Sequence, residues 1–275
     1  MTDTIEKKII ELFENRAEKF TPAELTVLLC RSFDLGKKTA GEMIRSLVTK
    51  GHLAYTDRHG RTVIDISFNR PVQVSDHIVL VPADIPFTQK PGMTAVRLLH
   101  GASFGDGHHP TTRISLQGVD FLVQILQENR ILSEQKENAV LDIGTGSGVL
   151  AIAAIRLGIN KGIGIDIDPC AISEARENAR INGLENRLQI SGNSLENIPD
   201  QSFSLITANL RLPTLNQLFS QILRLAEPKC GLVLSGIHCD EISHLLNAYM
   251  QQGFSCIWQK EEKDWAAIAM LRNSA

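Results

Sequence analysis

The chain has 275 residues, of which 43% are apolar and 21% charged, and its formal net charge is -3. This composition is typical of a globular protein with a large core, and it excludes a disordered or fibrous chain. No apolar run reaches the roughly 18–20 residues that span a bilayer, and the first residues lack a signal-peptide pattern. The five cysteines are scattered and form no CxxC pair, so we expect no structural metal, no membrane and a reducing cytoplasm.

Residues 1–70 read as a small separate domain. Apolar residues at helical spacing predict a first helix. The segment Thr21–Glu24 contains a capping box with Pro at the first helical position, and it opens a second helix. A third helix is predicted over Thr39–Lys50, followed by strands over His52–Thr56 and Arg61–Ile66. Three helices followed by a hairpin indicate a winged-helix-like domain.

The basic residues are unevenly distributed. Residues 1–70 hold 12 Lys and Arg against 10 Asp and Glu, whereas residues 71–275 hold 16 against 21. Within the first part, Lys37–Arg61 carries six basic residues and two acidic ones. Such a segment indicates an anionic partner, with nucleic acid as a candidate, or else a solvated helix face.

Residues 71–275 read as an α/β domain. Prolines punctuate an extended connector with one predicted strand, His77–Val81, and a helix is predicted over Thr112–Asn129. Further strands are predicted at Ala139–Ile143, Gly162–Ile165, Leu188–Ile190, Phe203–Ala208, Gly231–Leu234, Phe254–Trp258 and Ala266–Leu271. Helical patterns separate most of the first six runs, which predicts a doubly wound, mostly parallel sheet. The last two runs leave no room for a helix and should form an antiparallel hairpin at one end of the sheet.

A glycine-rich turn after the first of these strands is the strongest functional signal. Its sequence is DIGTGSG over residues 142–148, and Asp166 ends the next strand. The distal carboxylate is positioned to bind ribose hydroxyls. A dinucleotide site needs GxGxxG and a free helix N-terminus, whereas here the spacing is GxGxG and Asp142 repels a pyrophosphate. We therefore predict S-adenosylmethionine, which carries cationic groups and no phosphate, bound by Asp142, Gly144, Gly146, Gly148 and Asp166. A turn without a ligand is the alternative.

The same turn, with GIDIDP over residues 164–169 and NARING over residues 178–183, resembles the PrmA family. The stretch FGDGHHPTT over residues 104–112 is similar to that family's FGTGxHPTT signature, and Ala208-Asn209-Leu210 to its ANI motif. Members are S-adenosylmethionine-dependent methyltransferases that modify amines of a ribosomal stalk protein. The resemblance implies a class I, Rossmann-like, seven-stranded methyltransferase domain over residues 71–275 and a protein acceptor, possibly ribosomal.

The resemblance also implies site residues. Thr112, Gly144, Asp166 and Asn209 would contact the cofactor, and Asn193 would lie near the adenine edge. Helix capping is the alternative role for Asp166 and for Thr112. Asn209 is the predicted catalytic residue, because its amide can accept a hydrogen bond from the incoming amine; otherwise it holds the turn before Pro213.

Three departures from the family leave other functions open. Asp106 and His108 stand where the family has threonine, and Arg211 stands at the expected acceptor opening, where it reads an acidic target or lies on the surface. Residues 1–70 do not resemble the substrate-recruiting domain of the family. The alternatives are a methyltransferase acting on a nucleic acid or small molecule, or a DNA-binding regulator that senses S-adenosylmethionine without catalysis.

Overall fold

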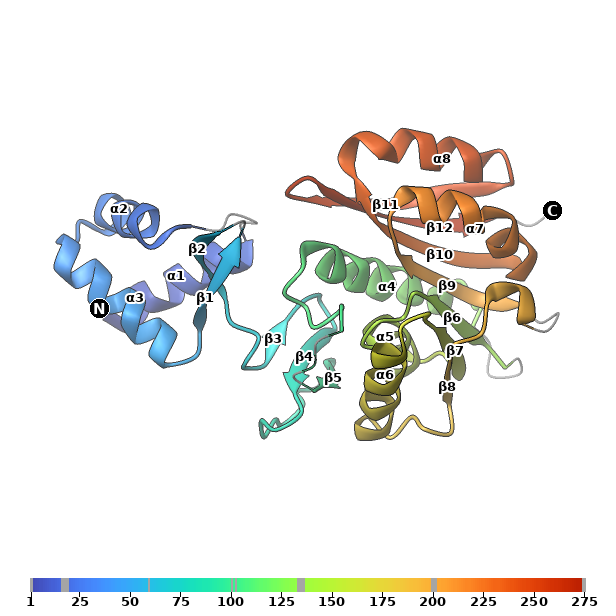
Figure 1. Cartoon of the computed structure of the whole chain (residues 1–275), viewed down its shortest axis with the longest axis horizontal. Helices are drawn as coiled ribbons and strands as arrows, with labels where there is room; N and C mark the ends of the chain where they lie inside the picture. Colours follow the sequence, from blue (N-terminus) through green and yellow to red (C-terminus); the bar gives the residue numbers. More distant parts are fainter. Residues whose placement is uncertain are drawn as a thin grey trace. The chain divides into compact units, whose positions relative to one another are not determined.

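The computed structural model describes residues 2–15, 20–58, 60–99, 101, 103–132, 137–198 and 202–273. The chain divides into two compact units, residues 1–70 and 71–275 (Figure 1). Among the described residues no helix has the length and apolar character needed to cross a membrane.

The first unit contains the predicted order of elements. These are α1 (Thr2–Asn15), α2 (Pro22–Phe33), α3 (Lys37–Thr49), β1 (Leu53–Arg58) and β2 (Arg61–Ile66). The predicted capping box is confirmed, since Thr21 and Glu24 bond each other's backbone N–H at the start of α2. β1 and β2 form an antiparallel hairpin, and Phe20 adds an isolated bridge to Ile64. Its similarity to a winged helix stays a prediction, although each expected element is present.

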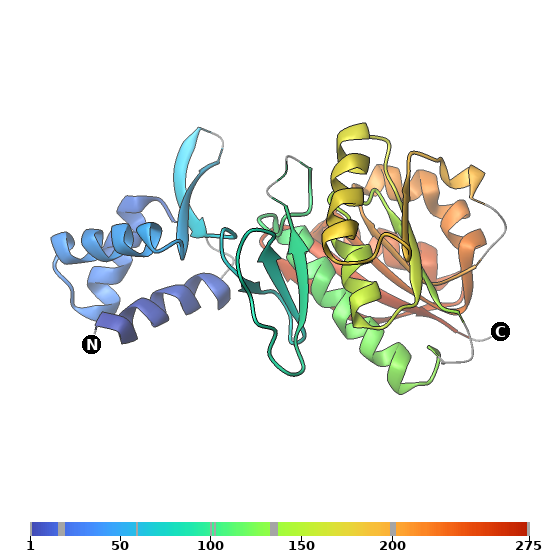
Figure 2. The same cartoon turned by 90° about the horizontal axis from the view of Figure 1, so that it is seen from below.

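The second unit begins with a small sheet that the sequence reading missed in part. β3 (Val72–Gln73), β4 (Ile78–Pro82) and β5 (Thr94–Leu98) form this sheet, with β4 parallel to β5. Figure 2 shows it apart from the larger sheet. Only β4 was predicted, because β3 is two residues long and β5 is specified by pairing across a proline-containing loop rather than by a local pattern. β5 packs against α5 and α6.

The larger sheet confirms the predicted seven strands. They are β6 (Ala139–Ile143), β7 (Lys161–Ile165), β8 (Leu188–Ser191), β9 (Phe203–Asn209), β10 (Ala226–His238), β11 (Phe254–Glu262) and β12 (Trp265–Arg272). Their order is β11-β12-β10-β9-β6-β7-β8. β8, β7, β6, β9 and β10 are parallel, and β12 is antiparallel to both β10 and β11. The hairpin at one end of the sheet is therefore confirmed.

Helices cover both faces of this sheet (Figure 1). They are α4 (Pro110–Glu128), α5 (Val149–Leu157), α6 (Pro169–Ile181), α7 (Leu212–Leu225) and α8 (Ile242–Met250), with single 3-10 turns η1 (Leu195–Asn197) and η2 (Cys239–Glu241). Residues of α7 and α8 share one core cluster with Leu232 and Leu234 of β10. Val233 points to the opposite face, towards Gly118 of α4. This alternation buries both faces and leaves the carboxyl ends of the strands to form a site.

Candidate functional site: a cavity at the carboxyl ends of the parallel strands

A cavity of about 890 Å³ lies at the carboxyl ends of β6, β7 and β9. Residues of several elements form its wall: 104, 109 and 111 before and within α4; 143, 144 and 146 at the end of β6; 165–167 at the end of β7; 193–196 after β8; 209–211, 214, 218 and 221 at the end of β9 and in α7; and Gly236 and Trp265. The order β9-β6-β7 makes these three strands neighbours, so residues far apart in the sequence meet at one edge of the sheet.

The glycine-rich turn forms the floor of this cavity. Gly144 and Gly146 line it, with φ of 68° and 54°, a region that favours glycine. A Cβ on Gly144 would lie 2.5 Å from Cδ2 of Leu210, and one on Gly146 would overlap the carbonyl oxygen of Phe104. Gly148 faces Ala175 of α6 instead of the cavity, where a Cβ would lie 3.3 Å from the alanine methyl carbon. Its role in the structure is helix packing.

Asp142 lies beneath the turn and does not line the cavity. It is 1% exposed, and its carboxylate accepts hydrogen bonds from the hydroxyls of Thr145 (2.7 Å) and Thr207 (2.6 Å). Burial raises the pKa of Asp142 to about 6, although these hydrogen bonds act in the opposite direction. The structure thus places Asp142 as a brace between the turn and β9 rather than as a direct ligand contact.

Asp166 presents an oriented carboxylate to the cavity. One oxygen accepts the N–H of Gly146 (2.8 Å) and the other accepts the N–H of Asp168 (3.0 Å). Each oxygen keeps a lone pair for another donor, such as a ribose hydroxyl. The helix-capping alternative belongs to Asp168, whose side chain accepts the N–H of Cys170 at the start of α6. The next side chain, Ile167, is 96% exposed at the cavity wall.

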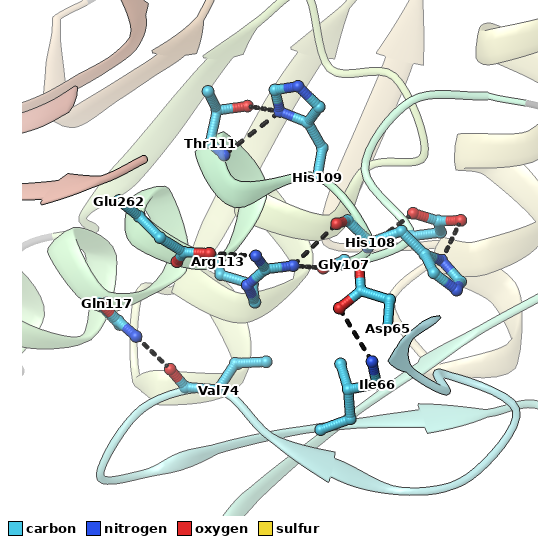
Figure 3. Close-up of polar contacts among 11 residues, drawn as sticks. Asp65, Ile66, Val74, Gly107, His108, His109, Thr111, Arg113, Gln117 and Glu262 are labelled. Atoms are coloured by element: carbon cyan, nitrogen blue, oxygen red, sulfur yellow. Dashed lines mark hydrogen bonds and ion pairs between the residues drawn. The ribbon is translucent and has the colours of Figure 1, made fainter. Parts of the chain in front are cut away.

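The stretch before α4 closes over the glycine turn. Arg113 of α4 donates to the carbonyl oxygens of Gly107 (2.9 Å) and His108 (2.8 Å) and forms an ion pair with Glu262 of β11 (Figure 3). Asp106 accepts from the backbone of His108 and pairs with its Nδ1 at 2.7 Å. Burial alone would raise the pKa of Asp106, but the bonds and charge of His108 hold it below its usual value. Asp106 and His108, the two residues that differ from the family signature, therefore bond each other.

His109 caps α4, a role that the sequence had offered for Thr112 as the alternative to cofactor binding. Its Nδ1 accepts the backbone N–H and the hydroxyl of Thr111 (Figure 3). A neutral ring that accepts at Nδ1 carries its proton on Nε2, so Nδ1 is not free to act as a base. Both threonines are 1% exposed, but Thr111 lines the cavity, whereas the Thr112 hydroxyl is buried without a hydrogen-bond partner among the described residues. Successive helical residues point about 100° apart, which explains why only one of the two threonines reaches the wall.

Asn209 ends β9 and lines the cavity. Its side-chain amide makes no hydrogen bond to the residues that the structure describes, so the turn before Pro213 is not held by it. That turn is held by backbone bonds, from Leu210 to the Ser235 carbonyl (3.0 Å) and from Thr214 to the Arg211 carbonyl (3.0 Å). Gly236, with φ of 80°, lets Leu210 approach, because a Cβ there would lie 2.7 Å from the Leu210 carbonyl oxygen.

Aromatic and charged side chains surround the cavity near Asn209. The Trp265 ring stacks on His238 with centroids 4.4 Å apart and meets the ring of His109 at 5.2 Å. The guanidinium of Arg211 lies 4.9 Å from the Trp265 centroid and donates to the Gly236 carbonyl (3.2 Å). Arg211 also lies 3.7 Å from Glu241. Arg211 is therefore a partly exposed member of the wall that is held by these contacts.

The structure brings together five of the predicted site residues and separates three. Gly144, Gly146, Asp166, Asn193 and Asn209 line the cavity; Thr112, Asp142 and Gly148 do not. The sequence reading missed Thr111, Ile167, Gly236 and Trp265 as wall residues. Ile167 could have been found from its place beside Asp166, whereas Gly236 and Trp265 carry no local signal. Among the described residues, no cluster of three His, Cys, Asp or Glu side chains could hold a metal ion.

Comparison with known proteins agrees with this geometry. A family model described as ribosomal protein L11 methyltransferase (PrmA) matches residues 65–273. The chain belongs to this family. Ribosomal protein L11 methyltransferases from Geobacter metallireducens and Glaesserella parasuis are 33% and 35% identical to it, over 72% and 74% of its length. The matched parts cover only 61% and 64% of those two PrmA-family proteins, so the shared segment is less than two thirds of each relative.

A solved member of the PrmA family shares the fold of the second unit. The crystal structure of ribosomal protein L11 methylase from Lactobacillus delbrueckii subsp. bulgaricus superposes with a TM-score of 0.62 at 27% identity. The match covers 74% of this chain and 99% of that one. The α/β fold with a seven-stranded mixed sheet is therefore that of a class I, Rossmann-like methyltransferase.

Proposed function

We propose that the cavity binds S-adenosylmethionine and that residues 71–275 transfer its methyl group to an amine of a protein. The observation that carries this proposal is the meeting of Gly144, Asp166 and Asn209 at the ends of three adjacent strands around one cavity. In open parallel sheets, ligands bind outside the carboxyl ends of the strands.

The chemistry of the wall supports this cofactor over a phosphate-bearing one. Asp166 and Glu196 are acidic, and Arg211 is the only Lys or Arg among the wall residues that the structure describes. Ile167, Leu195, Leu210 and Leu218 supply an apolar section for a purine ring. The glycine turn forms a cradle that a Cβ at Gly144 or Gly146 would fill. We expect Asp166 to hold the ribose, Asn193 to lie near the adenine, and Thr111 to take the position first assigned to Thr112.

The bound cofactor would supply an electrophilic methyl group, whose bond to sulfur breaks as a bond to the acceptor nitrogen forms. The chain must align the two reactants and exclude water. A lysine with a pKa near about 10.4 is almost wholly protonated at pH 7, so the site must favour its neutral form. The unbonded amide oxygen of Asn209 can accept from that amine, and the rings of His109 and Trp265 can pack on its aliphatic stem.

For the acceptor we propose a ribosomal protein, since the relatives are named for methylation of L11. A nucleic acid or small-molecule acceptor is the competing proposal, because the chain spans under two thirds of those relatives. For the first unit we propose a binding role towards an anionic partner at Lys37–Arg61, and nucleic acid is the candidate. We keep the cytoplasm as the proposed location on the cysteine pattern of the sequence.

Calorimetry with S-adenosylmethionine tests the cofactor. Asp166→Asn should weaken binding by about 10-fold or more, because the neutral amide is a poorer partner for two hydroxyls. Asp168→Asn is the matched control, since asparagine also caps a helix and should leave affinity unchanged. Equal affinities for wild type and Asp166→Asn would remove Asp166 from the site.

A tritiated-methyl assay tests the acceptor. Large ribosomal subunits, their protein fraction and their RNA fraction are offered separately, with protease or nuclease treatment afterwards. Label that enters the protein fraction and is released by protease supports the proposal. Label in RNA supports the competing acceptor, and cofactor binding without any transfer supports the sensor hypothesis.

A further inference from the structure

The first unit presents a helix pair joined by a very short turn. α2 ends at Phe33 and α3 begins at Lys37, and the turn between them contains Asp34 with φ of 52° and Gly36 at the N-cap. Two helices joined by a turn of three or four residues form a helix-turn-helix, whose second helix enters the major groove in DNA-binding proteins. The hairpin β1–β2 follows α3 directly.

One face of α3 is buried and the other is exposed. Ala40, Met43, Ile44 and Leu47 are buried in the core of the unit. Lys38 and Arg45 are exposed on the other side of the helix, Lys37 is exposed in its first turn, and Arg31 is exposed in the last turn of α2. None of these four cations forms an ion pair with the residues that the structure describes. We call Arg31, Lys37, Lys38 and Arg45 the α3 basic surface.

Other basic residues of the segment Lys37–Arg61 differ from these four cations, because they lie near acidic side chains. Lys50 is held by both carboxylate oxygens of Glu6, at 2.7 and 2.9 Å. That contact holds the pKa of Glu6 below its usual value. Hydrogen bonds from Thr21, with a smaller contribution from the charge of Arg61, hold the pKa of Glu24 below its usual value. The segment from residue 25 to residue 61 still holds seven Lys and Arg against three Asp and Glu, so its charge is not cancelled locally.

The spacing of the cations fits a duplex. Lys37 and Arg45 are eight residues apart on one helix, which corresponds to about 12 Å along the axis. The major groove of B-form DNA is about 12 Å wide and admits an α-helix, and the long side chains at the two ends of this stripe can extend to the phosphates that border the groove. Gly41 lies between them without a side chain, and Arg45 Nη1 would lie 3.6 Å from a Cβ there. The Arg45 guanidinium therefore covers the middle of the stripe, and the exposed Glu42 lies on the same face, so we expect the cations and not the middle of the stripe to contact the DNA.

We propose that the first unit binds duplex DNA, with α3 in the major groove and the α3 basic surface on the phosphates. The proposal rests on the anionic-partner role proposed above for this unit and names the partner; it does not depend on methyl transfer. A-form RNA has a major groove too narrow for a helix, so the proposal commits to B-form DNA. The affinity rests on backbone charges, and the structure identifies no base-specific contact.

Fluorescence anisotropy of the full chain with a labelled 24-base-pair DNA duplex tests this binding. Four phosphate contacts predict a slope of about -3.6 in log K against log salt, or roughly 100-fold weaker binding at 200 mM than at 50 mM salt. Lys37→Gln/Lys38→Gln should bring the slope to about -1.8. A second variant, Arg31→Gln/Arg45→Gln, should give the same reduced slope. Because the two variants change different residues, a local folding defect in one of them would not explain both results.

The matched control is Lys7→Gln/Lys8→Gln, which removes the same charge from two adjacent exposed lysines of α1. It should keep the wild-type slope. An equal loss in this control, or no binding to DNA at 50 mM salt, would overturn the proposal. Equal affinity for a duplex RNA of the same sequence would overturn insertion in the major groove. Cofactor affinity, measured in parallel, should be the same in all variants.

Discussion

The backbone N–H of Ser147 donates to the carbonyl oxygen of Phe104 at 2.9 Å. This bond joins the glycine turn after β6 to the stretch before α4, although the two are more than 40 residues apart. Phe104 and Gly146 both line the cavity as a result. The glycine turn and the stretch before α4, which are separate motifs in the sequence, therefore form one wall of the cavity.

Gly146→Ala should weaken S-adenosylmethionine binding by at least about 10-fold. A Cβ at this position overlaps the Phe104 carbonyl oxygen, so the turn and the stretch before α4 must separate. Gly183→Ala is the control, because Gly183 has φ of 67° but nothing within 4 Å of a Cβ. Both variants should lose about 1–2 kcal/mol from left-handed backbone strain. If calorimetry gives both the same cofactor affinity, the contact with Phe104 is unimportant for binding.

Asn209→Ala should lower the rate of methyl transfer by roughly 30- to 1,000-fold, which corresponds to about 2–4 kcal/mol in the transition state. Its melting temperature should stay close to that of wild type, since the side chain bonds no described residue. Asn182→Ala should behave in the opposite way. Asn182 bonds the backbone N–H (3.0 Å) and carbonyl (2.7 Å) of Arg97 and ties α6 to β5.

Single-turnover assays and thermal melts of both asparagine variants decide the role of Asn209. A variant at Asn209 that melts early and methylates at the wild-type rate would make this residue structural.

Asp142→Asn should change how stability depends on pH. Burial raises the pKa of Asp142 from 3.8 to about 6, so the folded protein binds this proton more tightly than the unfolded chain. The stabilisation is complete below about pH 4 and is lost as pH rises through about 6. A shift of about two pKa units corresponds to roughly 3 kcal/mol. Urea unfolding should be measured from pH 4 to 8. Over this range the free energy of unfolding of the variant should rise relative to that of wild type by up to this amount. If the two free energies change with pH in parallel, the burial argument is contradicted.

Arg113→Ala should raise the KM for S-adenosylmethionine several-fold and destabilise the fold by roughly 2–4 kcal/mol. The change releases the carbonyls of Gly107 and His108 and leaves Glu262, which is only 16% exposed, without its partner. Arg180→Ala is the control, because Arg180 pairs with Glu177 on the surface of α6 and should tolerate the change. Initial rates at varied cofactor concentration give the KM, and urea unfolding gives the stability. A wild-type KM for Arg113→Ala would show that the contacts of Arg113 do not contribute to cofactor binding.

Local sequence patterns were sufficient to predict several elements of the fold. The period of apolar residues identified all seven strands of the main sheet, and Thr21 and Glu24 specified the start of α2 through a bond between near neighbours. The glycine turn and Asp166 predicted the side of the cavity where we propose that the cofactor binds, because strand ends and sharp turns leave their residues at fixed positions relative to the backbone.

Which side chains face the cavity depends on contacts between residues far apart in the sequence. Thr111 reaches the wall and Thr112 does not, because their directions depend on where α4 begins, and that start is fixed by the cap from His109. Trp265 and Gly236 join the wall through the pairing of β10 with β12, a contact between residues nearly 30 positions apart. Likewise Lys50 differs from Lys37 only because folding brings Glu6 to it. Pairing and long-range charge contacts leave no local pattern, so these assignments required the fold.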